Sequence, residues 1–403
     1  VDRRTPALAL AVAVLAASLG AAGPSAGAAA APVAGRAVAP AAGAPRVALP
    51  APRSAVTGTP SPAATVKPRS SASAPDPARS DGTLQILTYR GYADYSGTTG
   101  EFEKSTGCRI ARYDTVQTAD QMAQAVRARP YDVVSAGPVL AADLIAAKQV
   151  QAIDPAKVPG YDDLTKRFRD MTVRAGKVYG VPYLWGYHEF LYDSSRVKGE
   201  PTLKDVFGSG HVVLRDSPLT IADAALADGV EGDPFELDKH ELAGAVGLLE
   251  DQPGRTYWTE PLDLVKGFAT GSLDYAQATP YYRLLLQQAG KPVKAVEAPR
   301  TTGWVDSWML GAGVPNTECA YRWLAYTATA TVQRKAVAWV GLAPANPKAC
   351  AKATQRVCDA YGVEDPESVE RVAFATRPPD GCKPKDGCPA YPVWADRWHA
   401  LVR

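Results

Sequence analysis

The residues best suited to chemistry lie at positions 302–315 of this chain. One carboxylate, Asp306, stands between Trp304 and Trp308 in an apolar run that predicts a buried strand. A buried charge is costly unless a partner compensates it. Two indole faces beside a carboxylate suit a desolvated ammonium group, because both attract a cation. The alternative on residue types alone is a strand-end acid satisfied by backbone amides or solvent.

Motifs of catalysis are scarce in the sequence. The four histidines, at positions 188, 211, 240 and 399, have no metal-binding spacing such as H-E-x-x-H. Neither a G-x-S-x-G nucleophile elbow nor a phosphate-binding P-loop occurs. A chain without such motifs, but with aromatic residues near strand ends, is typical of a binding protein rather than an enzyme. We therefore expect no catalytic residues, no cofactor and no resident metal.

Composition and the first 81 residues indicate the compartment. The 403 residues include 44 basic and 42 acidic ones, a net charge of +2, which lacks the basic footprint of a nucleic-acid binder. Residues 1–31 read as a secretory signal peptide, with Arg3 and Arg4 before an apolar run and an A-x-A site at positions 26–28. An uncleaved anchor is the alternative. Residues 32–81, rich in Ala and Pro, predict a disordered linker. The expected location is extracellular, associated with the cell envelope.

All six cysteines lie after the linker, and an even number in an exported chain suggests disulfides. Fifteen connectivities are possible for six cysteines. Cys382 with Cys388 and Cys350 with Cys358 close short loops and are the preferred local pairs. A zinc site is the weaker interpretation because no C-x-x-C motif occurs.

The order of predicted elements indicates an α/β fold with two lobes. Strands at 83–89, 109–116 and 131–135 alternate with helices at 98–105, 120–127 and 140–147, the pattern of a parallel sheet. After a long extended segment at 181–191 the alternation begins again, and it continues to about residue 289. Some 320 residues exceed what one core usually serves. Two α/β blocks joined by extended segments therefore predict two lobes linked by crossing strands.

Seven short motifs in order resemble those of a known family. The chain is similar to the substrate-binding component of spermidine/putrescine ABC importers, a family of extracellular solute-binding proteins, over roughly residues 84–346. The motifs are an aromatic-x-x-Tyr at 89–92, FEKSTG at 102–107, YDVV at 131–134, VQAID at 150–154, VPYLWG at 181–186, QAGKPV at 288–293 and GWVDS at 303–307.

The resemblance implies a bilobal periplasmic-binding-protein fold of type II. Lobe 1 would comprise residues 82–186 and 306–375, lobe 2 residues 187–305, and residues 376–403 would form a disulfide-containing tail. Residues 181–191 and 304–310 would cross between the lobes at a hinge. A small cationic, polyamine-like solute would be held between the lobes and delivered to a membrane permease with its cytoplasmic ATPase. The protein would contact the membrane only through that permease or through an uncleaved signal peptide.

The family's ligand-binding positions carry over only in part. Trp304 and Asp306 fall on its ammonium-binding Trp and Asp, Tyr92 matches its Tyr, and Tyr89 replaces a Trp. The remaining implied contacts depart from the family's residue types and are Gly137, Asp216, Ser217, Thr279 and Tyr281. In the second lobe the family places an Asp and a Glu where this chain aligns Ser217 and Thr220. Either Asp216 turns into the site, or the ligand has one cationic end and a different far end.

Three alternatives remain open. Tyr281 and Tyr282 resemble the phenolate pair of ferric-iron-binding transport proteins in the wider superfamily. A ligand-sensing exported protein would share every feature above except the permease. A secreted hydrolase on the same scaffold is possible in principle, since fold does not fix function, but the missing nucleophile and base motifs oppose it.

Overall fold

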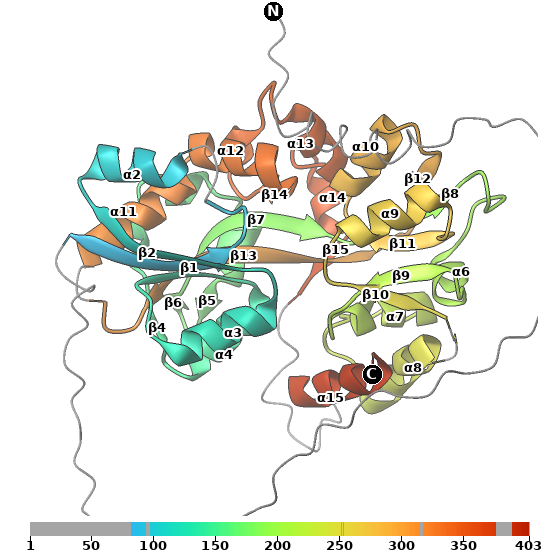
Figure 1. The fold of residues 1–403 in the computed structure, drawn as a ribbon. Coiled ribbons are helices and arrows are strands. Elements are labelled where there is room, and N and C mark those ends of the chain that lie inside the picture. The colour runs from blue at the N-terminus through green and yellow to red at the C-terminus, as the bar shows by residue number, and fades with distance from the viewer. Residues whose placement is uncertain are drawn as a thin grey trace, which may run out of the picture. The chain divides into compact units, whose positions relative to one another are not determined.

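A large mixed sheet forms the first half of the fold (Figure 1). The computed structural model describes residues 82–93, 97–250, 252, 254–314, 317–375 and 389–402, which all belong to one compact unit. Eight strands form the sheet in the order β14-β7-β13-β3-β1-β2, with β15 and β4 also paired to β13. Their bounds are β1 (Thr83–Tyr89), β2 (Arg109–Val116), β3 (Val133–Ala136), β4 (Val150–Gln151), β7 (Val181–Tyr187), β13 (Thr301–Gly311), β14 (Ala343–Pro344) and β15 (Val372–Phe374).

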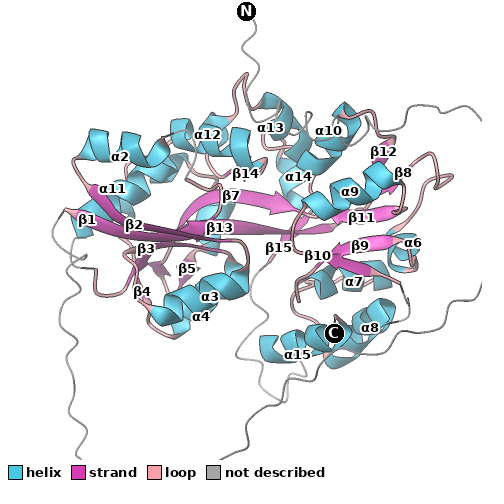
Figure 2. Cartoon of the chain, viewed as in Figure 1, coloured by secondary structure: helices cyan, strands magenta, loops and turns pink. Residues whose placement is uncertain are grey.

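Helices cover both faces of this sheet, which explains why β1, β3 and β7 read as nearly continuous apolar runs (Figure 2). Trp308 and Leu310 of β13 pack in one core with α2 (Thr98–Thr106), α11 (Thr317–Ala328) and α12 (Ala330–Val340). Met309 points to the opposite core with α3 (Ala119–Ala128) and α4 (Pro138–Ala146). Smaller elements complete this part: α5 (Lys166–Met171), β5 (Val173–Arg174), β6 (Lys177–Val178), α13 (Gln355–Tyr361) and α14 (Pro366–Glu370).

The second sheet has five strands in the order β10-β9-β11-β8-β12. They are β8 (Glu189–Asp193), β9 (Val212–Arg215), β10 (Thr256–Trp258), β11 (Tyr275–Ala278) and β12 (Val293–Ala295). The helices that belong with it are α6 (Leu203–Phe207), α7 (Thr220–Asp228), α8 (Lys239–Glu250), α9 (Leu262–Thr270) and α10 (Pro280–Gln288). β10, β9 and β11 run parallel, whereas β8 pairs antiparallel with β11 and β12.

Within the described residues, two segments lead from a strand of one sheet to a strand of the other. β7 ends at Tyr187 and β8 begins at Glu189, so only His188 separates a strand of the first sheet from a strand of the second. The return runs from β12 to β13 through residues 296–300. The predicted return crossing at 304–310 is therefore wrong, because these residues lie within β13 and pair inside the first sheet. The predicted crossing segment at 181–191 thus comprises β7 and most of β8. Along β13 the pairing with β7 shifts register between Asp306 and Ser307.

The C-terminal residues differ from the simple tail expected from the sequence. α15 (Tyr391–Leu401) buries Trp394 and Trp398 in the core of the second sheet, together with residues of α7 and α8. The indole N–H of Trp398 donates a 2.7 Å hydrogen bond to Asp216. The predicted Cys382–Cys388 pair lies outside the described residues.

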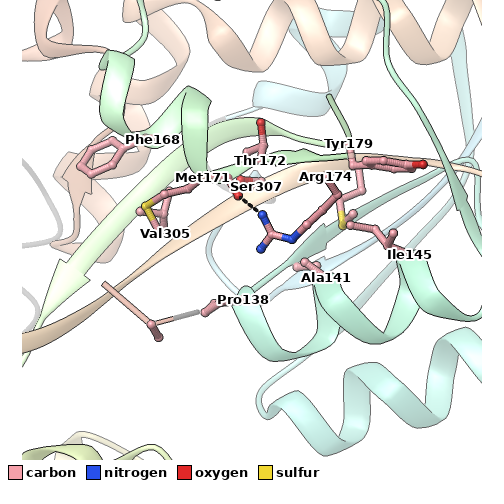
Figure 3. Close-up of a pocket in the computed structure, with 13 residues that line it drawn as sticks. Pro138, Ala141, Ile145, Phe168, Met171, Thr172, Arg174, Tyr179, Val305 and Ser307 are labelled. Atoms are coloured by element: carbon pink, nitrogen blue, oxygen red, sulfur yellow. Dashed lines mark hydrogen bonds between the residues drawn. The ribbon is translucent and has the colours of Figure 1, made fainter. Parts of the chain in front are cut away.

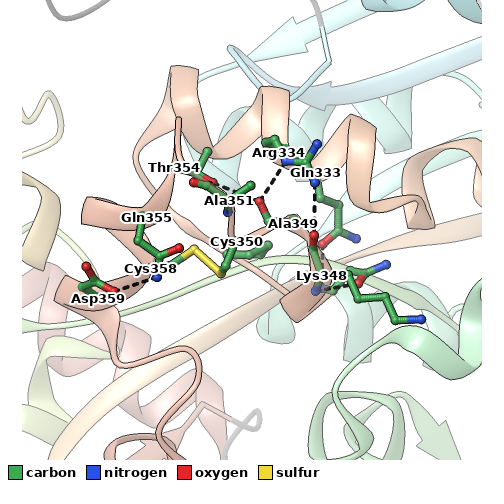
Figure 4. Close-up of a disulfide and its surroundings, with 12 residues drawn as sticks. Gln333, Arg334, Lys348, Ala349, Cys350, Ala351, Thr354, Gln355, Cys358 and Asp359 are labelled. Carbon is green, nitrogen blue, oxygen red and sulfur yellow. Dashed lines mark hydrogen bonds between the residues drawn. A yellow bond between two sulfur atoms is a disulfide. The ribbon is translucent and has the colours of Figure 1, made fainter.

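Two disulfides stabilise the described part of the chain. Cys350 pairs with Cys358 across a separation of eight residues, the local pair favoured by its spacing (Figure 4). Cys108 pairs with Cys319, 211 residues later, and ties the end of α2 to α11. Within the described residues, none of the helices combines the length and apolar character needed to cross a bilayer.

Candidate functional site

The carboxylate of Asp306 lies buried where three strands of the first sheet meet. Only 3% of the residue is exposed. Tyr92, which follows β1, donates its hydroxyl proton to Oδ2 of Asp306. Gly137, which follows β3, approaches the other oxygen, since a Cβ there would lie 3.0 Å from Oδ1. β1 and β3 are parallel and therefore end at the same edge. The structure thus brings together three predicted site residues from distant parts of the sequence.

The electrostatics of Asp306 leave its charge only partly compensated. Burial raises the pKa of Asp306 to about 6, against the lowering effects of the Tyr92 hydrogen bond, the positive charge of Arg215 and the polar contact with Trp304. Burial and the neighbouring carboxylate raise the pKa of Tyr92, so that its phenol remains a donor. At pH 7 Asp306 is largely ionised, and a second cation would stabilise it further.

Trp304 forms an aromatic wall beside this carboxylate. Its ring packs against Gly186 so closely that a Cβ there would lie 2.8 Å from the indole. The guanidinium carbon of Arg215 lies 4.8 Å from the ring centroid, and the His188 ring lies 5.3 Å away. Trp304 remains partly exposed. Tyr89, also partly exposed, adds a second aromatic face 5.5 Å from Tyr92.

Arg215 is the site residue that sequence reasoning missed. It ends β9, and the next residue, Asp216, is the predicted contact. Side chains alternate along a strand, so these neighbours point to opposite sides. Asp216 is exposed and accepts its hydrogen bond from Trp398, while Ser217 accepts one from the backbone N–H of Leu219. Neither contacts Trp304 or Asp306 within the described residues, whereas Arg215, one residue earlier, lies against Trp304. The assignment of Asp216 and Ser217 as ligand contacts stays a prediction.

Thr279 and Tyr281 lie at the start of α10. Thr279 is buried. The Tyr281 ring packs over Gly341, where a Cβ would lie 2.2 Å away, and meets Tyr282 edge to face at 5.6 Å. Burial raises the pKa of both phenols. The Tyr281 and Tyr282 rings pack against different hydrophobic cores, as expected of residues that serve packing. No cluster of three His, Cys, Asp or Glu side chains suited to a metal occurs within the part of the chain that the structure describes.

A separate small cavity of about 50 Å³ lies between α4, α5 and β13 (Figure 3). Pro138, Thr172, Val305 and Ser307 are among its lining residues. Arg174 also lines it, but its guanidinium donates to the carbonyl oxygens of Met171 and Val173. This volume holds a water molecule or two and is too small for an organic solute.

Comparisons with known proteins agree with this architecture. Residues 99–357, well over half of the 403 residues, match the family model of bacterial extracellular solute-binding proteins. Among solved structures the chain is similar to the spermidine/putrescine substrate-binding protein PotD of Streptococcus pneumoniae, with 15% identity and a TM-score of 0.64 over 80% of this chain and 100% of that one. The Atu4243 GABA receptor gives 18% identity and a TM-score of 0.64 over 80% and 98% of the two chains. The binding protein MotA of A. tumefaciens B6, solved in complex with glucopine, has 16% sequence identity and a TM-score of 0.61; the match covers 80% of this chain and 100% of that one. At these identities the likeness shows the fold, and it confirms the predicted bilobal α/β class.

Proposed function

Because the chain belongs to the family of bacterial extracellular solute-binding proteins, we propose that it captures a small solute with a cationic, polyamine-like ammonium end. Asp306 is the proposed partner of that ammonium group, and Trp304, Tyr89 and Tyr92 are the aromatic walls. The observation that carries this proposal is the burial of Asp306 with a pKa raised to about 6 beside a partly exposed indole. Such a carboxylate gains stabilisation from a cation.

Delivery to an ABC permease and its ATPase follows as the proposed role. The two connections between the sheets, at His188 and at residues 296–300, are suited to a hinge. Closure about such a hinge would enclose the solute between the sheets. The predicted signal peptide at 1–31 would export the protein, and the predicted linker at 32–81 would tether its folded part outside the membrane. A sensor that presents the same ligand to a receptor is the second candidate, and the site chemistry would be identical.

Enzymatic activity is not part of the proposal. The family is one of transport proteins, and the site has no nucleophile with an adjacent base. The iron alternative gains no support, because the Tyr281 and Tyr282 rings pack against different hydrophobic cores.

A thermal-shift screen of the full chain tests the proposal. The probes are putrescine, spermidine, amino acids, quaternary amines and ferric citrate. We expect at least one ammonium compound to raise the melting temperature in proportion to the logarithm of its concentration above Kd. A shift with ferric citrate alone, accompanied by visible phenolate-to-iron absorbance, would support the iron alternative. No response to any ammonium compound would contradict the proposal.

A further inference from the structure

We propose that Arg215 is a second anchor of the same site and binds a carboxylate of the solute, which makes the solute class an amino acid with separated ammonium and carboxylate ends. This inference rests on the proposed function and narrows it. A polyamine would place a second ammonium where Arg215 already supplies positive charge. Three observations support it: Arg215 lies beside the same indole as Asp306, a buried network holds its side chain, and it makes no direct ion pair within the described residues.

Arg215 and Asp306 approach the same indole. The guanidinium lies over the Trp304 ring, 4.8 Å from the centroid. Asp306 follows Trp304 by two residues on β13, and Trp304 makes a polar contact with its carboxylate. The positive charge of Arg215 also acts on both Asp306 and Tyr92. A site with one fixed charge of each sign beside an aromatic wall is complementary to a zwitterion.

A buried network holds the Arg215 side chain in place. Asp223 Oδ2 lies 2.7 Å from Nδ1 of His188, so the carboxylate favours the proton on that nitrogen. Nε2 of the same ring then presents its lone pair to Nη1 of Arg215, 3.3 Å away. Gln277 completes the arrangement, because its amide nitrogen donates to Asp223 at 2.8 Å and its oxygen accepts the backbone N–H of Arg215 at 2.8 Å. His188, Asp223 and Gln277 are each less than 5% exposed. We assign them as positioning residues.

Arg215 forms no ion pair with a carboxylate within the described ranges. Two other arginines near the second sheet do form ion pairs with carboxylates. Arg196 pairs with Asp274 at 2.6 Å and Arg283 with Glu189 at 2.8 Å. Arg215 is partly exposed, and its guanidinium faces an aromatic ring and a neutral acceptor instead. A guanidinium offers two parallel N–H groups that match a carboxylate. The side chain is therefore oriented and charged; within the described residues it makes no direct ion pair, and Asp306 is an acid on which its charge acts.

The class of solute follows from charge balance. Asp306 would attract one ammonium group of a diamine, but Arg215 would repel the other. Like charges at close range repel strongly in a partly buried site, so this repulsion weakens diamine binding. An amino acid would be attracted at both ends, its ammonium group by Asp306 and its carboxylate by Arg215. Asp216 does not offset this repulsion, since it is directed to Trp398.

Calorimetric titration of the full chain with matched ligands tests the inference. The series comprises ω-amino acids of two to six carbons, the diamines and monoalkylamines of equal length, and the corresponding carboxylic acids. We expect the best amino acid to bind at least tenfold more tightly than its diamine and its alkylamine. Arg215→Gln should abolish that preference, because it weakens amino-acid binding and relieves the repulsion of a second ammonium group. Arg196→Gln, which removes a paired arginine of the same half, should change neither.

Two further variants distinguish binding from folding. Arg215→Lys keeps the charge without the planar fork and should retain part of the preference. His188→Gln should reduce the ratio of amino-acid to alkylamine affinity, whereas a merely structural role would lower both affinities together. Tighter binding of a diamine by the wild type, with no effect of Arg215→Gln on selectivity, would overturn the inference and leave the proposed function intact. Failure of every amine and amino acid to bind would overturn both.

Discussion

The hydroxyl of Tyr92 donates a hydrogen bond to the carboxylate of Asp306, 214 residues later in the chain. This contact joins the loop after β1 to the middle of β13. One hydrogen bond stabilises the ionised acid but does not replace the water that burial has removed, and the pKa of Asp306 remains near 6. The ligand-free site therefore keeps a carboxylate at some cost in stability, as expected of a residue retained for binding rather than for folding.

The pH dependence of binding follows from that pKa. An ammonium ligand pairs with ionised Asp306, so below pH 6 binding must first remove a proton. We expect Kd to be nearly constant from pH 7 to 8 and to weaken by up to tenfold per pH unit below 6. Calorimetry at pH 5, 6, 7 and 8 measures this profile. A flat profile down to pH 5 would show that the ligand does not depend on this carboxylate.

The same pKa predicts how the free energy of unfolding of the ligand-free protein varies with pH. Asp306 ionises at about 3.8 when unfolded but near 6 when folded. The unfolded state therefore loses this proton first, and stability falls as pH rises from 4 through 6. The loss is about 3 kcal/mol above pH 7. Denaturant unfolding of Asp306→Asn should lack this component; identical profiles for wild type and variant would contradict the prediction.

Gly186 allows the Trp304 ring to pack closely against β7. A Cβ at this position would fall 2.8 Å from the ring and 3.0 Å from Leu342. Gly186→Ala should therefore displace the indole and weaken ligand binding at least tenfold, with about 1–3 kcal/mol of lost stability. Gly247→Ala is the matched control, because nothing lies within 4 Å of the added methyl group. The control should bind normally and, being in helix α8, gain up to about 1 kcal/mol. Equal affinities of both variants would argue against Trp304 as part of the site.

The C-terminal helix is predicted to be part of the folded core. Trp398 is 1% exposed, packs with the second sheet and donates to Asp216. Trp398→Ala should cost about 3–5 kcal/mol in unfolding free energy. Val393, in the same helix, is 42% exposed, and its replacement by Ala should change stability by less than about 0.5 kcal/mol. Chemical denaturation compares the two; a small effect of Trp398→Ala would mean that α15 is not docked.

The disulfides make a further prediction. Loop-closure entropy assigns about 5 kcal/mol to Cys108–Cys319 and about 2.5 kcal/mol to Cys350–Cys358, because the first closes a far longer loop. Cys108→Ser should therefore lower the melting temperature more than Cys350→Ser. Peptide mapping without reduction should recover both pairs and a third, Cys382–Cys388. Free thiols at the last two positions would refute that third pair.

Much of the fold was predictable because apolar residues recur along the sequence with the clear spacing of strands and helices. The sequence predicts β1, β2, β3 and the helices that follow each of them from buried runs and helical spacing, and the structure places these elements within a few residues of the predicted bounds. The crossing was visible in the sequence at 181–191, as an extended segment without helical period. α15 was not predicted, because its tryptophans follow a cysteine-containing segment and their partners lie almost 200 residues earlier.

The site was less predictable for a physical reason. Asp306, Trp304 and Tyr92 could be identified because a buried carboxylate between indoles is unusual and the family motif supports it. Arg215 carries no such signal: its role depends on which side of β9 it faces and on His188 and Asp223, which come from different elements. A one-residue error in a strand reverses the direction of every side chain. The sequence therefore directed attention to Asp216, whose carboxylate instead holds the C-terminal helix.

The measurement that tests the central claim most directly is the calorimetric affinity of Asp306→Asn for the best ammonium ligand at pH 7. The substitution keeps an acceptor for Tyr92 and removes the charge. Asp170→Asn serves as the control, because Asp170 forms only an exposed ion pair with Lys166. We predict that Asp306→Asn weakens binding by at least a few kcal/mol and that the control binds like the wild type. Unchanged affinity of a folded Asp306→Asn protein would contradict the assignment of Asp306 as the ligand's ammonium partner.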